Sequence, residues 1–139
     1  MNYRSMLADD YEYVYHLWEN TEGMNLSEAD SREEILRYLE RNPGMSQVCV
    51  NEDGTLAGTA MCGHDGRRGY MYHVAVSGAS RGKGVGRELV SLCLNRLLQE
   101  GIAKCHLMVI EGNSLGRSFW GGLGWQERDG IVLFSRNTF

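Results

Sequence analysis

Residues 70–86 read YMYHVAVSGASRGKGVG and decide the fold of this chain. The first part, Tyr70–Val76, is rich in aromatic and β-branched side chains, which is typical of a strand. From Gly84 the apolar side chains recur at helical spacing as far as Gln99 or Glu100, and Gly101 ends the run. The stretch therefore predicts a strand, a glycine-rich loop and a long helix in direct succession.

Two helices and a hairpin are predicted upstream of this stretch. A strand over 1–5 comes first, followed by a helix that is capped by Asp9 or Asp10 and ends near Asn20. A second helix is opened by Asp30 or Ser31 and stopped by Asn42–Gly44. Strands over 46–51 and 55–63 then form the hairpin. Together with Tyr70–Val76, the last two strands form a three-stranded antiparallel meander.

Downstream, the pattern predicts a strand over 103–110, which a helical crossover places parallel to Tyr70–Val76. A short helix from Asn113 to about Gly121 and a final hairpin of Trp125–Glu127 with Ile131–Ser135 follow. The expected fold is α/β (α+β): a mixed, mostly antiparallel central sheet of six to seven strands flanked by about four helices. We expect a single domain over residues 1–139.

Composition excludes several classes of function. The 139 residues carry 14 basic and 18 acidic side chains, a net charge of −4, which argues against a broad nucleic-acid surface. The first ten residues lack the apolar core of a signal peptide, and no run approaches the roughly 18 apolar residues of a membrane span. We therefore expect a cytoplasmic protein without membrane or nucleic-acid partners. The widely spaced Cys49, Cys62, Cys93 and Cys105 favour small buried side chains over metal ligands or disulfides, and no metal is expected.

The segment Arg81–Gly86, here named the glycine loop, has the composition of an anion site. Glycine makes up 18 of the 139 residues, about 13% against a typical value of about 7%. Glycines at alternate positions before a helix let the backbone approach a bulky anion, and the first-turn amides and the helix dipole favour phosphate. Arg81 and Lys83 add two local positive charges. A flexible connection with solvated basic side chains remains the alternative. Neither a Walker loop nor the G-x-G-x-x-G spacing of a dinucleotide site is present.

Three segments together resemble the GNAT superfamily of N-acetyltransferases. That family's signature is Arg or Gln, two residues, Gly, one residue, and Gly or Ala, and Arg81-Gly82-Lys83-Gly84-Val85-Gly86 fits it. Tyr72–Val76 is similar to the family's strand before the loop, and Asn113–Trp125 to its segment beginning with asparagine. The order of elements agrees over nearly the whole chain. The resemblance implies two central parallel strands that splay apart.

The resemblance also implies that acetyl-CoA is the acetyl donor. Backbone groups of the splayed strand would pair with the pantetheine arm, and the amides from Gly82 to Arg87 would hold the pyrophosphate. Asn113 would contact the pantetheine or the thiol end, or simply cap its helix, and the two roles are compatible. The predicted acetyl-CoA-binding residues are Val74, Ala75, Val76, Arg81, Gly82, Lys83, Gly84, Val85, Gly86, Arg87 and Asn113.

The reaction implied is direct attack of a neutral amine on the acetyl thioester, which calls for an acid, a base and oxyanion donors. The family's usual acid, a tyrosine in the helix after the asparagine, falls on Trp120, and an indole cannot release a proton to a thiolate. Water, Tyr72 or Tyr70 would then protonate the leaving thiolate, or turnover would be slow.

For the base, His73 has suitable chemistry and adjoins the acyl-contacting strand. Strand alternation, however, puts His73 on the opposite face from Tyr72 and Val74, and a structural role is the alternative. Tyr72 and His73 are thus the catalytic candidates. A further set of side chains would line an amine pocket or form a solvated face: Glu12, His16, Glu19 and Glu22.

The expected function is an acetyl-CoA-dependent N-acetyltransferase acting on the primary amine of a small molecule or protein. A catalytically weak CoA-binding or regulatory module is the first alternative, and an interaction domain that has lost its ligand is the second. A small-molecule or peptide acceptor is the expected partner, and a homodimer is left open.

Overall fold

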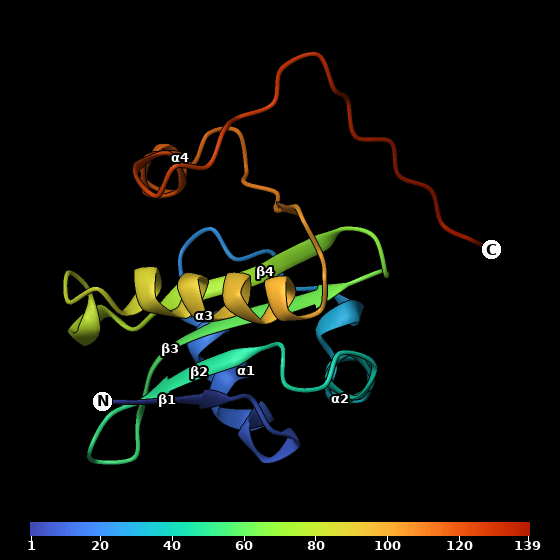
Figure 1. The fold of residues 1–139 in the computed structure, drawn as a ribbon. Helices are drawn as coiled ribbons and strands as arrows, with labels where there is room; N and C mark the ends of the chain where they lie inside the picture. Colours follow the sequence, from blue (N-terminus) through green and yellow to red (C-terminus); the bar gives the residue numbers. More distant parts are fainter. The chain divides into compact units, whose positions relative to one another are not determined.

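The structure, a computed structural model, describes residues 1–139, which form two compact units over residues 1–108 and 109–139 (Figure 1). The first unit holds the whole sheet and three α-helices, and the second holds one α-helix. The expectation of a single domain over 1–139 stays a prediction.

A five-stranded mixed sheet forms the centre of the first unit, in the order β1-β2-β3-β4-β5. The four strands from β1 to β4 pair antiparallel, while β4 and β5 pair parallel. This confirms the predicted mixed, mostly antiparallel sheet and the parallel crossover after the glycine loop. The strands are β1 (Asn2–Ser5), β2 (Gln47–Val50), β3 (Leu56–His64), β4 (Gly69–Val76) and β5 (Cys105–His106).

Helices cover both faces of this sheet. Helix α3 lies across β2, β3 and β4 on one face, and α1 packs on β3 and β4 from the other (Figure 1). Gly58 on β3 lets α3 approach closely, because a Cβ there would lie 2.9 Å from Val85 Cγ1 and 3.0 Å from Leu89 Cδ1. The helices of this unit are α1 (Tyr11–Glu19), α2 (Arg32–Arg41) and α3 (Val85–Gln99), with short 3-10 helices η1 (Ala8–Asp10), η2 (Glu28–Asp30) and η3 (Gly78–Ser80).

The core follows the predicted apolar pattern. Val14 and Trp18 of α1 are fully buried against the sheet, as are Val48 of β2 and Leu89 of α3. All four cysteines are free thiols; three are buried and Cys105 is half-buried. Burial raises the pKa of Cys105 to about 12, so this thiol stays protonated near neutral pH. None of the helices combines the length and apolar character needed to cross a membrane.

The second unit contains α4 (Ser114–Gly122), which begins where the sequence predicts. Asn113 caps it, with Oδ1 accepting a hydrogen bond from the Gly116 amide at 2.9 Å. Arg117 forms a two-pronged ion pair with Glu127 on the surface. The rings of Trp120 and Trp125 meet edge to face, with centroids 5.0 Å apart.

The predicted number of strands is too high. The sheet has five strands instead of six to seven, and β5 covers only Cys105–His106 instead of 103–110. The predicted final hairpin of Trp125–Glu127 with Ile131–Ser135 does not form strands. Ile131–Phe134 is an unbroken apolar run whose side chains are all exposed, at 67% or more. Without a buried face, little apolar burial offsets the entropy lost in ordering a strand.

Candidate functional site

The glycine loop adopts a conformation that depends on glycine. Gly82 has φ +76° and Gly84 has φ +81°, both in the left-handed region, and Gly84 is the residue directly before α3. A Cβ at either position would meet no atom within 4 Å. Glycine is therefore needed at these two positions for the left-handed backbone conformation and not for close packing. The space above the loop is open.

The loop also presents free donors. None of the backbone amides from Arg81 to Arg87 donates a hydrogen bond to another backbone group. The amides of Val85, Gly86 and Arg87 form the first turn of a 15-residue helix, where the helix dipole adds partial positive charge. Such a cluster of amides at a helix start can bind a phosphate group.

Positive side chains surround these amides. Arg81, Lys83 and Arg87 are exposed, and Arg81 Nε donates to the Val76 carbonyl at 3.4 Å, which ties the loop to the end of β4. Three cations at one point favour an anion locally although the chain carries a net charge of −4. The predicted residues Arg81–Arg87 thus combine unpaired amides with exposed cations, which suits a polyphosphate.

The adjoining edge of β4 is open. Strand β5 pairs only with Gly69 and Tyr70, so β4 beyond Tyr70 has no neighbouring strand on that side. This is the predicted splay of the two central parallel strands. Val74, Ala75 and Val76 lie on the open stretch, where their backbone can pair with an extended ligand. Ala75 is buried, and the two valines are half-buried.

A β-bulge interrupts β4 at His73. Thr59 opposes Ala75 while Met61 opposes Tyr72, so His73 and Val74 together face the single residue Ala60. His73 has φ +49° and is the only non-glycine residue of the chain in the left-handed region. The bulge turns the His73 side chain toward the face that carries Tyr72. Both side chains therefore line the same cavity. The prediction from strand alternation, that these side chains lie on opposite faces, is wrong for this reason.

This cavity, here named the β4 cavity, has a volume of about 510 Å³. It opens between η2, α2 and β4, beside the strand predicted to contact the acyl group. Its wall is part apolar and part polar, which suits an organic molecule carrying an amine. The lining residues are Asn25, Ser27, Ala29, Asp30, Glu34, Ile35, Arg37, Tyr38, Arg41, Met61, Tyr72 and His73.

Both catalytic candidates face this cavity. Burial, with smaller effects from Tyr70 and Cys105, raises the pKa of Tyr72 above its ordinary value of 10.0. Tyr72 therefore keeps its proton near neutral pH and can donate it. The Nε2 atom of His73 lies 2.6 Å from Asp30 Oδ1.

Asp30 is the residue that the sequence did not mark as functional. The sequence offered Asp30 or Ser31 as the cap of the second helix, and Ser31 caps α2, with its hydroxyl accepting a hydrogen bond from the Glu34 amide at 3.3 Å. Asp30 instead faces His73, which is 43 positions further along the chain. No local pattern signals a partner at that separation.

The polar set predicted near the first helix, Glu12 to Glu22, does not reach the cavity. Glu12, His16, Glu19 and Glu22 are all exposed, and none of them lines it. Glu12 pairs instead with Arg32 at 3.3 Å. The solvated face, which was the alternative interpretation, describes these residues.

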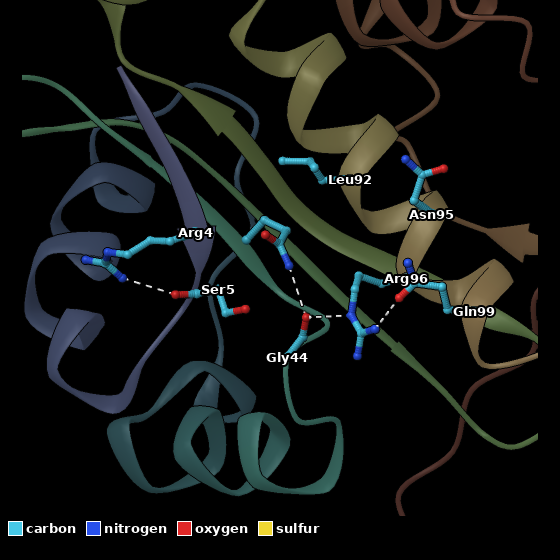
Figure 2. Close-up of a pocket in the computed structure, with 8 residues that line it drawn as sticks. Arg4, Ser5, Gly44, Leu92, Asn95, Arg96 and Gln99 are labelled. Atoms are coloured by element: carbon cyan, nitrogen blue, oxygen red, sulfur yellow. Dashed lines mark hydrogen bonds between the residues drawn. The ribbon is translucent and has the colours of Figure 1, made fainter.

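A second pocket, of about 480 Å³, lies between β1 and α3 (Figure 2). Arg96 Nε donates to the Gly44 carbonyl at 3.2 Å, and Gln47 Nε2 donates to the same oxygen at 3.0 Å. The Arg96 and Gln47 side chains are thus already hydrogen-bonded to the backbone. None of the predicted site residues lines this pocket: its wall is Arg4, Ser5, Gly44, Gln47, Leu92, Asn95, Arg96 and Gln99.

The two remaining predicted positions, Asn113 and Trp120, belong to the second unit. Asn113 caps α4, as one of its two predicted roles requires. Its contact with a ligand stays a prediction. The Trp120 ring lies 5.0 Å from Phe119, edge to face, and so takes part in a small aromatic cluster.

Comparisons with known proteins agree with this fold. The model of the acetyltransferase (GNAT) family matches residues 11–125. An acetyltransferase of Pectobacterium atrosepticum is 32% identical over 136 residues, which cover 98% of this chain and 95% of that protein. Among solved structures, this chain is similar to the PaiA N-acetyltransferase from Thermoplasma acidophilum in complex with coenzyme A. The TM-score is 0.80 at 20% identity, and the match covers 94% of this chain and 92% of the PaiA chain. Ard1 from Thermoplasma volcanium has a TM-score of 0.77 at 19% identity, over 88% and 80% of the two chains.

Proposed function

This chain belongs to the GNAT acetyltransferase family, and on that premise we propose that it moves the acetyl group of acetyl-CoA to a primary amine of a small molecule or peptide. The single observation that carries the proposal is the glycine loop. The amides from Arg81, at its start, to Arg87, just after its end, have no backbone partner, and the same segment carries three exposed cations.

The shape of the site supports the same donor. The pyrophosphate of acetyl-CoA would lie on the glycine loop, and its pantetheine arm would run along the open edge of β4 at Val74–Val76. This path leads toward the bulge and the β4 cavity. The thioester would therefore be brought close to a cavity that can hold an amine.

The residues on this path have the required chemistry. A backbone amide of Val74–Val76 would stabilise the oxyanion that forms when the amine attacks the thioester carbonyl. Tyr72, which stays protonated at neutral pH, would donate a proton to the departing thiolate in place of the tyrosine that Trp120 replaces. The family resemblance would also give Asn113 a contact with the pantetheine or the thiol end.

The second candidate function is a CoA-binding module with weak turnover, and Trp120 is the observation that favours it. An indole cannot act as the acid that the family ordinarily places at that position. Tyr72 supports the enzyme over the binding module, because it supplies a second source of the proton.

Two measurements test the proposal. Titration calorimetry with CoA should show saturable binding, and no heat at millimolar CoA would refute it. Thiol release from acetyl-CoA should then be measured with alanylalanine amide, Nα-acetyllysine amide and glucosamine as acceptors. Acceptor-dependent thiol release supports the transferase. Tight CoA binding with no release for any of the three would favour the binding module.

A further inference from the structure

We infer that His73 is the general base for the acceptor amine and that Asp30 is the positioning residue that holds its ring in the required tautomer. The inference rests on the proposed function, since it assigns the proton acceptor of that reaction. Its starting point is the 2.6 Å contact between His73 Nε2 and Asp30 Oδ1 at the edge of the β4 cavity.

The contact fixes which ring nitrogen carries the proton. A carboxylate only accepts hydrogen bonds, so Nε2 of the neutral imidazole donates to Asp30. The lone pair is then on Nδ1, which forms no hydrogen bond within the chain. A histidine with one nitrogen held by a buried carboxylate and the other free is an oriented base.

Asp30 is itself held in place. Its side chain is 9% exposed, and Oδ2 accepts a hydrogen bond from the Ser27 amide at 3.0 Å. Its carbonyl accepts from the Tyr11 hydroxyl at 2.7 Å, which anchors η2 to α1. The Ser27 amide within the η2 segment and the Tyr11 hydroxyl of α1 therefore hold Asp30 so that its carboxylate faces the ring.

The rest of His73 is fixed just as firmly. The Trp18 ring packs against the imidazole with centroids 4.6 Å apart. Trp18 Nε1 donates to Thr59 Oγ1 at 3.0 Å, and this hydroxyl donates to the His73 carbonyl at 2.9 Å. A left-handed residue other than glycine costs on the order of 1–3 kcal/mol and persists only where the surroundings enforce it. Here the enforced conformation is the one that turns the ring into the cavity.

The proton balance is complete with these groups. His73 Nδ1 takes one proton from the bound ammonium, and Asp30 stabilises the imidazolium that results. The neutral amine attacks the thioester carbonyl, the C–N bond forms and the C–S bond breaks. The nitrogen loses its second proton to solvent, Tyr72 protonates the thiolate and regains its proton from solvent, and the imidazolium releases its own proton to solvent. One proton is released overall for each amide formed.

Other charged and titratable groups face the same space. They belong to α2 and β4 and will affect any pH profile: Glu34, Arg37, Tyr38, Arg41 and Tyr72. Glu34 is paired with Arg37 at 2.6 Å, so the charges of this pair largely cancel. Asp30 is the charged side chain that hydrogen-bonds to the His73 ring.

The first test needs no acceptor. Long-range proton–nitrogen NMR on the ¹⁵N-labelled full chain should show, at pH 8, a neutral His73 ring with its proton on Nε2. Asp30→Asn places an amide donor opposite Nε2 and should move the proton to Nδ1. A proton on Nδ1 in the unsubstituted protein, or a doubly protonated ring at pH 8, would overturn the inference.

The second test uses thiol release with whichever of the three panel amines reacts fastest. His73→Asn, which tolerates the left-handed conformation, should lower kcat by roughly 100-fold at pH 7. The loss should shrink toward pH 10, where more of the amine is neutral in solution, and CoA affinity should not change. A loss of the same factor at every pH, or a loss of CoA binding, would indicate a structural role and refute the base.

His64→Gln is the matched control, since Nε2 of His64 also contacts a carboxylate, that of Glu100 at 3.5 Å, but lies outside the β4 cavity. It should leave kcat unchanged. If CoA fails to bind the unsubstituted protein, the proposed function fails, whereas the NMR experiment still reports the Asp30–His73 tautomer. The two failures are therefore distinguishable.

Discussion

The glycine loop and the β4 cavity lie at the two ends of the open stretch of β4, and they are built in opposite ways. The loop is one run of consecutive residues whose amides have no backbone partner. In the cavity, the His73 ring is held by Asp30, 43 positions away in the chain, and by Trp18. An anion site needs free donors, whereas proton transfer needs a fixed geometry. Binding of the acetyl donor thus depends on consecutive residues, whereas proton transfer from the acceptor depends on residues that only the tertiary structure brings together.

The largest expected effect is on the loop. Gly84→Glu should weaken CoA binding by about 100-fold or more, because like charges brought together cost several kcal/mol and each 1.4 kcal/mol is tenfold in affinity. Titration calorimetry measures the affinity. The matched control is Gly101→Glu, since Gly101 has φ +80° and equally open space, and so carries the same backbone strain away from the loop. Equal affinities of the two variants would contradict the assigned site.

The next effect concerns the hydrogen bonds that hold His73 at the β4 cavity. Thr59→Val removes the hydroxyl that joins Trp18 Nε1 to the His73 carbonyl. A buried indole donor left without a partner should lower the free energy of unfolding by about 1–3 kcal/mol. Urea denaturation measures this change. Thr21→Val is the control, since the half-buried Thr21 hydroxyl, just after the end of α1, donates only to the Leu17 carbonyl. A loss no larger than that of the control would show that the network does not hold the bulge.

A smaller effect is expected from the aromatic cluster of the second unit. Trp120→Tyr restores the acid that the family places at this position and should raise kcat by roughly a few-fold if protonation of the thiolate limits turnover. Steady-state thiol release measures it. Trp125→Tyr changes a neighbouring indole of the same cluster and should give no increase. An unchanged kcat in Trp120→Tyr would mean that Tyr72 or water already supplies the proton fast enough.

The smallest effect concerns acid stability near the start of α1, the helix that carries Trp18. Burial alone opposes ionisation of Asp10, but hydrogen bonds from Arg4, at 2.8 Å, and from the Leu7 amide outweigh it and lower the pKa of Asp10 below 3.8. A lowered folded-state pKa gives stability that is full above the unfolded value and is lost as the pH falls through the folded one.

Below about pH 4, the melting temperature of the unsubstituted protein should therefore fall more steeply than that of Asp10→Asn. Thermal denaturation between pH 5 and pH 2.5 tests this. Asp9→Asn, at an exposed neighbouring position, should follow the unsubstituted protein. Parallel curves for Asp10→Asn and the unsubstituted protein would rule out this contribution.

Most of the fold was predictable, because its signals are local. The run from Tyr70 to Glu100 is observed as strand, loop and helix within one or two residues of the predicted ends. Helix α4 begins beside Asn113 because an asparagine cap needs only the next few residues. The end of the chain was not predictable in this way. The apolar run Ile131–Phe134 has strand composition but forms no strand, and its side chains are exposed.

In the candidate site, too, the part made of consecutive residues was predictable and the part made of distant residues was not. The predicted loop residues lie together at the start of α3, since consecutive residues cannot separate. Asp30 was missed, because an aspartate before a helix has the pattern of a cap whether or not it contacts a histidine elsewhere. His73 was found by its chemistry, but strand alternation placed it on the wrong face.

The sequence by itself thus determined the antiparallel meander, the crossover helix and the glycine-rich anion site, since hydrophobic periodicity and glycine conformation act over a few neighbouring residues. Only the tertiary structure decided the bulge that faces Ala60, the turn of His73 toward Tyr72 and the pairing with Asp30. The physical reason is that a bulge is set by the register between two strands, and a side-chain pair by the packing of two elements. Neither the register nor the packing is contained in the residues adjacent to His73.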